Sequence, residues 1–124
     1  MAIFSKQQQT TQETKATTII SQGAVIKGEL EFSAKLHIEG VIEGKINSTN
    51  LISIGKTGKI KGEVKANKLL VDGNFEGKIE VDVLEITKSG KVIGDILIKD
   101  LIIDQGGVFE GTSSLKKKDA GKKS

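Results

Sequence analysis

The sequence contains no cysteine, no proline, no tryptophan and no tyrosine, and its 124 residues include only four phenylalanines. Without cysteine the chain can form neither a disulfide nor a thiolate metal site, so nothing in it calls for an oxidising compartment. It has no apolar run of about 18 residues, the length that predicts a transmembrane helix. Its first residues lack the charged segment followed by an apolar segment that marks a secretory signal. We therefore expect a cytoplasmic protein.

Arginine is also absent, since all 19 basic residues are lysines. Residues 18–111 hold 12 lysines against 14 acidic residues, whereas residues 112–124 hold five lysines against one aspartate. The net charge of +3 therefore arises at the two ends of the chain. Nucleic-acid-binding domains usually present arginines and a basic face on the folded body itself. The near-neutral body argues against a nucleic-acid partner.

The central part of the chain is a repeat marked by glycine. One glycine recurs every 15 to 18 residues, at Gly28, Gly44, Gly62, Gly77, Gly94 and Gly111. Two positions before these glycines stand Ile26, Ile42, Ile60, Phe75, Val92 and Phe109, and two positions after all but the last stand Leu30, Ile46, Val64, Ile79 and Ile96. Apolar residues two apart predict β-strands, because successive side chains of a strand alternate between its two faces.

A second apolar pair opens each repeat and is followed by a second glycine. The pairs begin at Leu36, Ile52, Leu69, Leu84 and Leu101, and the second glycines are Gly40, Gly58, Gly73, Gly90 and Gly107. These glycines predict corners, where a tight turn often needs a positive φ. One coil cannot bury its inward residues alone, so the coils must stack. We predict an all-β fold, a compact right-handed β-helix of about six rungs over residues 18–111, between disordered tails at residues 1–17 and 112–124.

The main alternative fold is the left-handed hexapeptide helix of acyltransferases, whose coils also hold about 18 residues. That fold requires an apolar residue at every sixth position. Here the apolar residues come in pairs two apart and the repeat length varies between 15 and 18. This pattern favours a right-handed or irregular β-helix.

Charged residues flank the first series of glycines in two columns that alternate in sign. The columns are Lys27, Glu43, Lys61 and Glu76 on one side, and Glu29, Lys45, Glu63, Lys78 and Asp95 on the other. Opposite charges on neighbouring strands contribute about 0.2–1 kcal/mol, and like charges cost a similar amount. A slip by one rung would set like charges side by side, so we interpret the columns as a ladder that fixes the register. The simpler alternative is that mixed charge only keeps this surface solvated.

Four segments of the repeat resemble the bactofilin family. They read TTIISQGAVIKGEL at residues 17–30, LHIEGVIEGKI at 36–46, LISIGKTGKIKGEV at 51–64 and LLVDGNFEGKI at 69–79. The resemblance implies a right-handed β-helix that polymerises without nucleotide into non-polar filaments. It also implies a cytoskeletal scaffold at the inner face of the cytoplasmic membrane, which supports cell shape and places cell-wall enzymes.

The two ends of the predicted rod are the main candidate sites. A terminal rung leaves backbone groups unpaired and an apolar cross-section exposed, and monomeric repeat proteins cover both with a polar or helical cap. The sequence shows no such cap, so we predict that copies of the chain stack end to end. The predicted contact residues are Leu101, Ile103, Val108 and Phe109 at one end, and Ile19 and Ile20 at the other. Alternatively a tail folds over each end, which leaves a non-polymerising binding scaffold.

The first residues form a small apolar tip with one cation, and the resemblance implies that such a tip contacts the membrane. The tip consists of Met1, Ala2, Ile3, Phe4 and Lys6. One tip binds only marginally, but many tips act together along a polymer. Alternatively this is the ordinary start of a tail. The lysines at 116–118 and 122–123 could contact anionic lipid, although a simple solubilising tail is the favoured interpretation.

The chain shows no catalytic group. His37 is the only histidine and should point outward, and the next residues in its column, Ser53 and Leu70, complete no triad. No second histidine or cysteine is present for a metal site, and no glycine run leads into a helix to bind a nucleotide. We therefore expect no enzymatic activity and no cofactor. Four apolar residues should also point outward, on different faces that form no single patch: Leu70, Ile93, Leu97 and Ile102.

Overall fold

The computed structural model describes residues 17–116, which form ten β-strands and no helix. Most strands are four or eight residues long, whereas β6 and β7 each run for 13 residues around a corner. The strands are β1 (Thr17–Ile20), β2 (Val25–Phe32), β3 (Lys35–Ile38), β4 (Val41–Ser48), β5 (Leu51–Ile54), β6 (Lys59–Val71), β7 (Asn74–Ile86), β8 (Lys91–Ile98), β9 (Asp100–Ile103) and β10 (Val108–Leu115).

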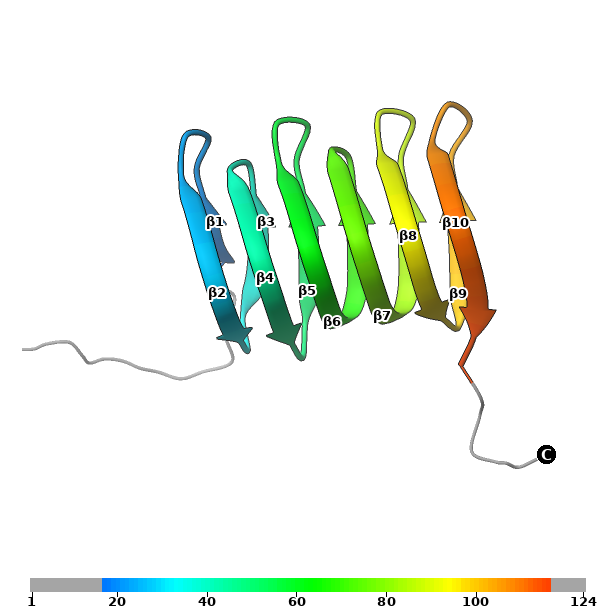
Figure 1. The fold of residues 1–124 in the computed structure, drawn as a ribbon, viewed down its shortest axis with the longest axis horizontal. Coiled ribbons are helices and arrows are strands. Elements are labelled where there is room, and N and C mark those ends of the chain that lie inside the picture. The colour runs from blue at the N-terminus through cyan, green and yellow to red at the C-terminus, as the bar shows by residue number, and fades with distance from the viewer. Residues whose placement is uncertain (1–16, 117–124) are drawn as a thin grey trace, which may run out of the picture.

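The strands wind right-handed into six rungs that stack along one axis (Figure 1). Rungs 1, 2 and 6 consist of β1 with β2, β3 with β4, and β9 with β10. In between, rung 3 consists of β5 and the first half of β6. Rung 4 consists of the second half of β6 and the first half of β7, and rung 5 of the second half of β7 and β8. All pairings between rungs are parallel. The predicted β-helix of about six rungs is confirmed.

The first glycine series lies in register up the rungs, as the spacing predicted. Gly62 has a φ of 140°, and a Cβ there would lie 1.9 Å from the carbonyl oxygen of Gly44 on the rung below. The second series differs from the prediction, because its members have no positive φ. A glycine is needed at Gly73 because the neighbouring rung approaches closely. A Cβ added there would lie 2.2 Å from the carbonyl oxygen of Gly55. From rung 2 to rung 6 only glycine fits either column, for two different reasons.

The corners absorb the variable length of the repeat. Four residues link β5 to β6 and β7 to β8, but only two, Glu39–Gly40, link β3 to β4. The acid of this short corner supports the longer corner on the next rung, since the Thr57 hydroxyl donates to Oε1 of Glu39 at 2.7 Å. Nε2 of His37 lies 2.8 Å from Oε2 of the same carboxylate. The Thr57 hydroxyl, followed by His37, holds the pKa of Glu39 below its ordinary value.

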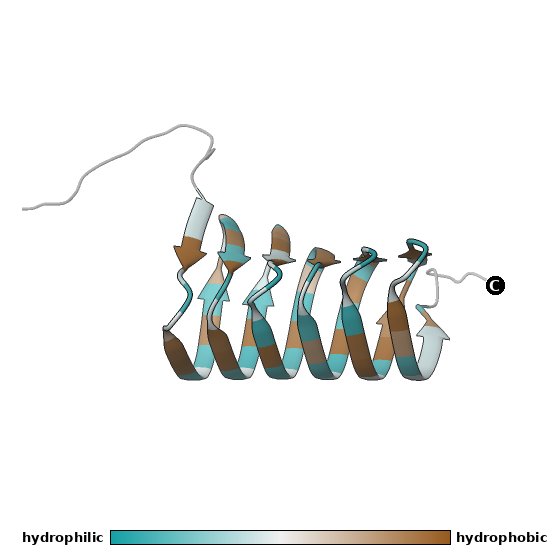
Figure 2. Cartoon of the chain, turned by 90° about the horizontal axis from the view of Figure 1, so that it is seen from above, coloured by the Kyte–Doolittle hydropathy of each residue, from teal (hydrophilic) through white to brown (hydrophobic). Residues whose placement is uncertain are grey.

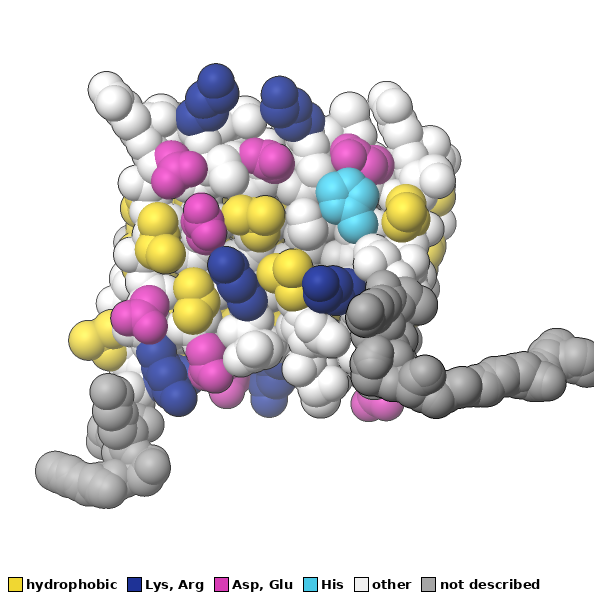
Figure 3. All heavy atoms as spheres, turned by 180° about the vertical axis from the view of Figure 1, so that it is seen from behind, with side chains coloured by type: hydrophobic (Ala, Val, Ile, Leu, Met, Phe, Trp, Pro, Cys, Tyr) yellow, Lys and Arg dark blue, Asp and Glu magenta, His cyan; other side chains and the backbone are white. Residues whose placement is uncertain are grey.

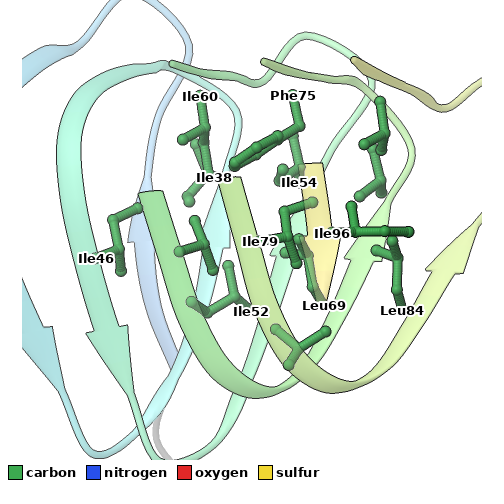
Figure 4. Close-up of a cluster of buried hydrophobic side chains, with 14 of the residues drawn as sticks. Ile38, Ile46, Ile52, Ile54, Ile60, Leu69, Phe75, Ile79, Leu84 and Ile96 are labelled. Atoms are coloured by element: carbon green, nitrogen blue, oxygen red, sulfur yellow. The ribbon is translucent and has the colours of Figure 1, made fainter. Parts of the chain in front are cut away.

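The core is a continuous stack of branched aliphatic side chains with one aromatic ring. Figure 4 shows Ile38, Ile54, Ile60 and Phe75 projecting from rungs 2, 3 and 4 into the interior. Phe75 is 2% exposed and the three isoleucines are fully buried. No polar or charged residue within 17–116 is buried. Figure 2 shows the same division as hydrophobic segments that alternate with hydrophilic ones along the strands.

The folded part extends beyond the expected boundary at Gly111. Strand β10 continues to Leu115, with Thr112–Leu115 paired against Asp95–Ile98, and the amide of Lys116 donates to the carbonyl of Ile98 at 2.7 Å. Backbone pairing, to which a polar side chain is no obstacle, orders this segment. Nζ of Lys116 lies 3.0 Å from Oδ1 of Asp82, and this hydrogen bond is the main cause that lowers the pKa of Asp82. Lys116 therefore belongs to the solenoid and not to the tail.

Candidate functional site

Each end of the solenoid presents two edge strands that pair on one side only. At the first rung β1 pairs with β3 and β2 with β4, and at the last rung β9 pairs with β7 and β10 with β8. The free edges carry unpaired amide and carbonyl groups, which are a ready template for another strand. In the described residues no helix or loop crosses either edge. Within residues 17–116 both ends are therefore open to strand addition.

The exposed hydrophobic side chains gather on the same two rungs. Within residues 17–116, every large hydrophobic residue that is more than about a third exposed lies on rung 1 or rung 6: Ile19, Val25, Ile102, Ile103, Val108 and Leu115. One outward column shows the contrast clearly, because it holds valine at both ends, Val25 and Val108, and polar residues on rungs 3 to 5. The apolar character of the surface is concentrated where another rod would stack.

The structure places the predicted contact residues of the last rung at its open end. Ile103 is 42% exposed and Val108 is 39% exposed, whereas Leu101 and Phe109 are partly buried against the core. Ile103 continues the buried column of Ile86, so its exposed side faces the missing next rung. These four residues form one end surface.

At the first rung the two predicted contact residues behave differently. Ile20 faces inward and is only 6% exposed, because it packs on the Ile38 column. Ile19 faces outward in the column of His37 and is 62% exposed. The end surface also includes Ile26, Leu30 and Phe32, which pack partly buried against the core. The sequence analysis did not select these three, nor Leu115 at the other end, although the same two-residue alternation marks them as inward-facing.

The charged columns lie in the predicted register. Lys27 pairs with Glu43 and Glu43 with Lys61, while Glu29 pairs with Lys45, and the alternation continues through Glu63, Glu76, Lys78 and Asp95. Among these nine residues one pair comes within ion-pair distance, Lys27 and Glu43 at 3.9 Å. Exposed ion pairs contribute little individually. The role of the columns in fixing the register stays a prediction.

His37 contacts two side chains, Ser53 and Glu39. The sequence analysis named Ser53 as a neighbour but did not identify Glu39. Nδ1 of His37 is 3.2 Å from Oγ of Ser53, and its Nε2 contacts Glu39. Glu39 follows His37 by two residues on the same side of the chain, a spacing that could have identified it. Nucleophilic catalysis would also need donors for an oxyanion, and the amide of Gly55 already donates to Ile38. We interpret the trio as a link between rungs 2 and 3.

The predicted membrane-contact residues, Met1, Ala2, Ile3, Phe4 and Lys6, lie outside the described residues. Their role stays a prediction. The described part of the chain contains no helix long and apolar enough to cross a membrane. Within residues 17–116 no group of histidine and acidic side chains is placed to hold a metal ion.

The repeat matches known bactofilins. Residues 18–114 match the sequence model of the bactofilin family, which is described as polymer-forming and cytoskeletal. Two similar proteins come from Myxococcus xanthus. Bactofilin BacN is 43% identical over 56 residues, which cover 45% of this chain and 50% of that protein. Bactofilin BacP is 26% identical over 95 residues, which cover 76% of this chain and 40% of that protein. The chain thus spans half or less of these relatives.

A solved structure shares the fold. The cryo-EM reconstruction of double helical filaments of Thermus thermophilus bactofilin matches with a TM-score of 0.68 at 22% sequence identity. The match covers 80% of this chain and 99% of that one. The six-rung solenoid, the open ends and the family match over residues 18–114 agree. The chain belongs to the bactofilin family of polymer-forming cytoskeletal proteins.

Proposed function

We propose that this chain assembles end to end, through its first and last rungs and without nucleotide, into filaments that serve as a cytoskeletal scaffold. The observation that carries the proposal is the concentration of exposed hydrophobic residues on the two terminal rungs. Stacking another rod there continues both the backbone ladder and the aliphatic core. The resulting filament is a longer solenoid with the same cross-section.

The apolar contacts decide whether such a junction is stable. Each end offers edge strands of four and eight residues. About ten ladder hydrogen bonds at about 1 kcal/mol net each roughly offset an association cost of about 4–15 kcal/mol. The exposed apolar residues of rung 6 are Ile102, Ile103, Val108 and Leu115. Together they leave roughly 350 Å² exposed, and burying about half of that area adds about 4 kcal/mol at 25 cal/mol per Å². This surplus favours the junction.

Electron microscopy of the purified protein without nucleotide tests the assembly. We expect filaments whose narrowest width equals one solenoid, above a critical concentration. Analytical ultracentrifugation below that concentration should show short oligomers that grow with concentration. A monomer at all concentrations would contradict the proposal and favour a non-polymerising binding scaffold.

The attachment points of the two tails favour a membrane-bound filament. Thr17, where the described chain begins, and Lys116, where it ends, both lie at the edge of the rod away from the four-residue corners (Figure 1). Stacked rods would therefore carry all their tails along one edge. We propose that residues Met1–Phe4 and Lys6 contact the inner face of the cytoplasmic membrane from this edge, and that the filament places cell-wall enzymes and supports cell shape.

Deletion of residues 2–6 tests the membrane contact. Filaments of the wild-type chain should sediment with vesicles that contain phosphatidylglycerol. The deletion variant should stay in the supernatant, in fractions that contain no vesicles. Deletion of residues 8–12, a polar segment of the same length, is the matched control and should leave binding unchanged. Equal binding by both variants would contradict a role for the tip.

A further inference from the structure

One side of the solenoid is built from its short strand segments. This short-strand face consists of the outward residues of β1, β3, β5, the second halves of β6 and β7, and β9 (Figure 3). Two columns run along it, in rung order. They are Ile19, His37, Ser53, Leu70, Glu85 and Ile102, and beside them Thr17, Lys35, Leu51, Lys68, Val83 and Asp100.

Apolar residues cross this face in a zigzag over rungs 3 to 6. Leu51, Leu70, Val83 and Ile102 occupy the two columns alternately on four successive rungs, and Figure 3 shows hydrophobic side chains gathered along the middle of the face. Three of them are half-buried and Ile102 is 44% exposed. Our expectation that Leu70 and Ile102 fall on different faces is wrong, because both lie in the column of His37. The strip is a candidate interaction surface that is too small to mark one by its size alone.

The opposite side of the solenoid differs. There Ile93 is also half-buried and outward-facing, but it lies between Glu76 and Glu110 in the charged column. A single apolar residue among charges is ordinary surface. The two sides therefore offer a matched pair of positions, Leu70 within the strip and Ile93 outside it.

The central rungs of the short-strand face are complementary to themselves, whereas Ile102 at the end of the strip would meet His37. A two-fold axis along the strand direction through Leu70 would place Leu70 on its own copy, and Leu51 on Val83 of the second copy. The same axis sets Lys35 opposite Asp100, two charged residues for which the described chain holds no ion-pair partner within 4.0 Å.

Three like-charge contacts oppose this arrangement and are weak. Asp72, on the corner rim of rung 4, would meet its own copy, and solvent and salt screen this contact. Lys68 would meet its own copy, but its Nζ lies 3.6 Å from Oε1 of Glu85, which offsets the repulsion. Glu39 and Asp104 would meet at the corner rim, where solvent and salt screen them. The central contacts therefore favour the pair.

The area of the face determines whether single protomers can pair through it or only filaments can. With rungs about 4.8 Å apart and outward columns about 6.6 Å apart, the strip and its flanks cover about 250 Å² on each partner. A stable protein dimer needs a total of about 1,200–2,000 Å², so two free protomers should not pair. A filament repeats the strip in every protomer, and many weak contacts then act together.

We propose that the short-strand face is the surface on which two filaments of this chain pair side by side, so its occupant is a second copy of the chain. This inference rests on the proposed end-to-end assembly. Face-to-face sheets pack about 10 Å apart, a distance that Leu51, Leu70 and Val83 can fill from both sides.

The substitution Leu70→Lys, compared with Ile93→Lys, tests the face. Filaments are imaged and their mass per unit length is measured by scanning transmission electron microscopy. We expect paired filaments for the wild-type chain and for Ile93→Lys, and single filaments with a twofold lower mass per unit length for Leu70→Lys. Pairs that persist in Leu70→Lys, pairs lost in both variants, or only single filaments in the wild type would each overturn the inference. Absence of any wild-type filament would instead overturn the proposed end-to-end assembly.

A charge exchange tests the same face without touching the apolar strip. Lys35→Glu alone and Asp100→Lys alone should each convert paired filaments into single ones. The double variant restores the opposite charges and should restore the pairs. If the double variant behaves like the single ones, the self-complementary arrangement is wrong, whatever the folding of Leu70→Lys.

Discussion

Replacement of Ile103 by lysine should stop filament growth and leave the protomer folded. Ile103 lies in the last rung, above the buried column of Ile86, with 42% of its area exposed in the single chain. In a filament this exposed part meets the next rod. In the single chain a lysine can keep its stem on the core and extend its ammonium into water. The substitution therefore acts on the junction more than on the fold.

The expected loss follows from the area and the charge. The exposed part of Ile103 amounts to roughly 80 Å², which contributes about 2 kcal/mol to a junction that buries it. Enclosing an unpaired ammonium in the same place costs at least about 2 kcal/mol more, even when the lysine relaxes toward the rim. A total of about 4 kcal/mol raises the dissociation constant of the junction about 1,000-fold. Filaments that form at micromolar concentration should then require millimolar concentration.

Sedimentation velocity measures this loss directly. Wild-type protein should sediment as filaments, and Ile103→Lys as a species of one or two chains of 13.2 kDa. One chain indicates that unlike ends meet in the filament, and two chains indicate that the intact first rungs still join. Ile93→Lys, an outward position on rung 5, is the control and should polymerise normally. If Ile103→Lys polymerises at the wild-type critical concentration, the last rung is not part of the junction.

Three further substitutions probe the solenoid itself. Gly62→Ala should prevent folding or lower the melting temperature by more than about 10 °C, since it combines a positive φ with a clash against backbone. Circular dichroism measures the melting temperature, and a value equal to that of the wild type would refute the close-packed glycine column. Lys116→Ala should lower the melting temperature slightly at neutral pH, and because the pKa of Asp82 is depressed in the folded state, the difference should vanish as pH falls below the ordinary carboxyl value of 3.8; a difference that grows in acid would contradict the assignment. Lys45→Glu with Lys78→Glu should lower the melting temperature more than glutamates at the last two lysines of the chain, and equal effects would rule out the register ladder.

The repeat and its register could be predicted because they depend on local pattern. Inward residues such as Ile42 and Ile46 each stand two positions from Gly44, and this alternation, repeated in every rung, is typical of a strand. The same glycine aligns with Gly28 and Gly62 on neighbouring rungs, as the structure shows. Period and alignment together determine the solenoid, since the stacked coils bury the alternating residues without help from any other element.

The remaining features depend on what lies across the rungs, which sequence spacing does not show. Thr112–Leu115 has the composition of a tail, yet it is ordered because the Asp95–Ile98 segment offers a free edge. Gly73 is a glycine because the carbonyl of Gly55 approaches it, not because of its own φ. The grouping of Leu70 with Ile102 is different, because both stand between the two members of an apolar pair, so the sequence pattern could have shown their shared column.

The distribution of apolar residues up the outward columns distinguishes a polymer from a monomer. A solenoid that remains single gains solubility most from polar residues on its terminal rungs, because these have solvent on one more side than the others. This chain shows the reverse. Ile19 and Ile102 end one outward column and Val25 and Val108 end another. The middle rungs of both columns hold polar residues such as Ser53 and Asn74, except for Leu70 and Val41. Apolar residues at the column ends increase stability only when the terminal rungs are no longer terminal, that is, within a stack of rods.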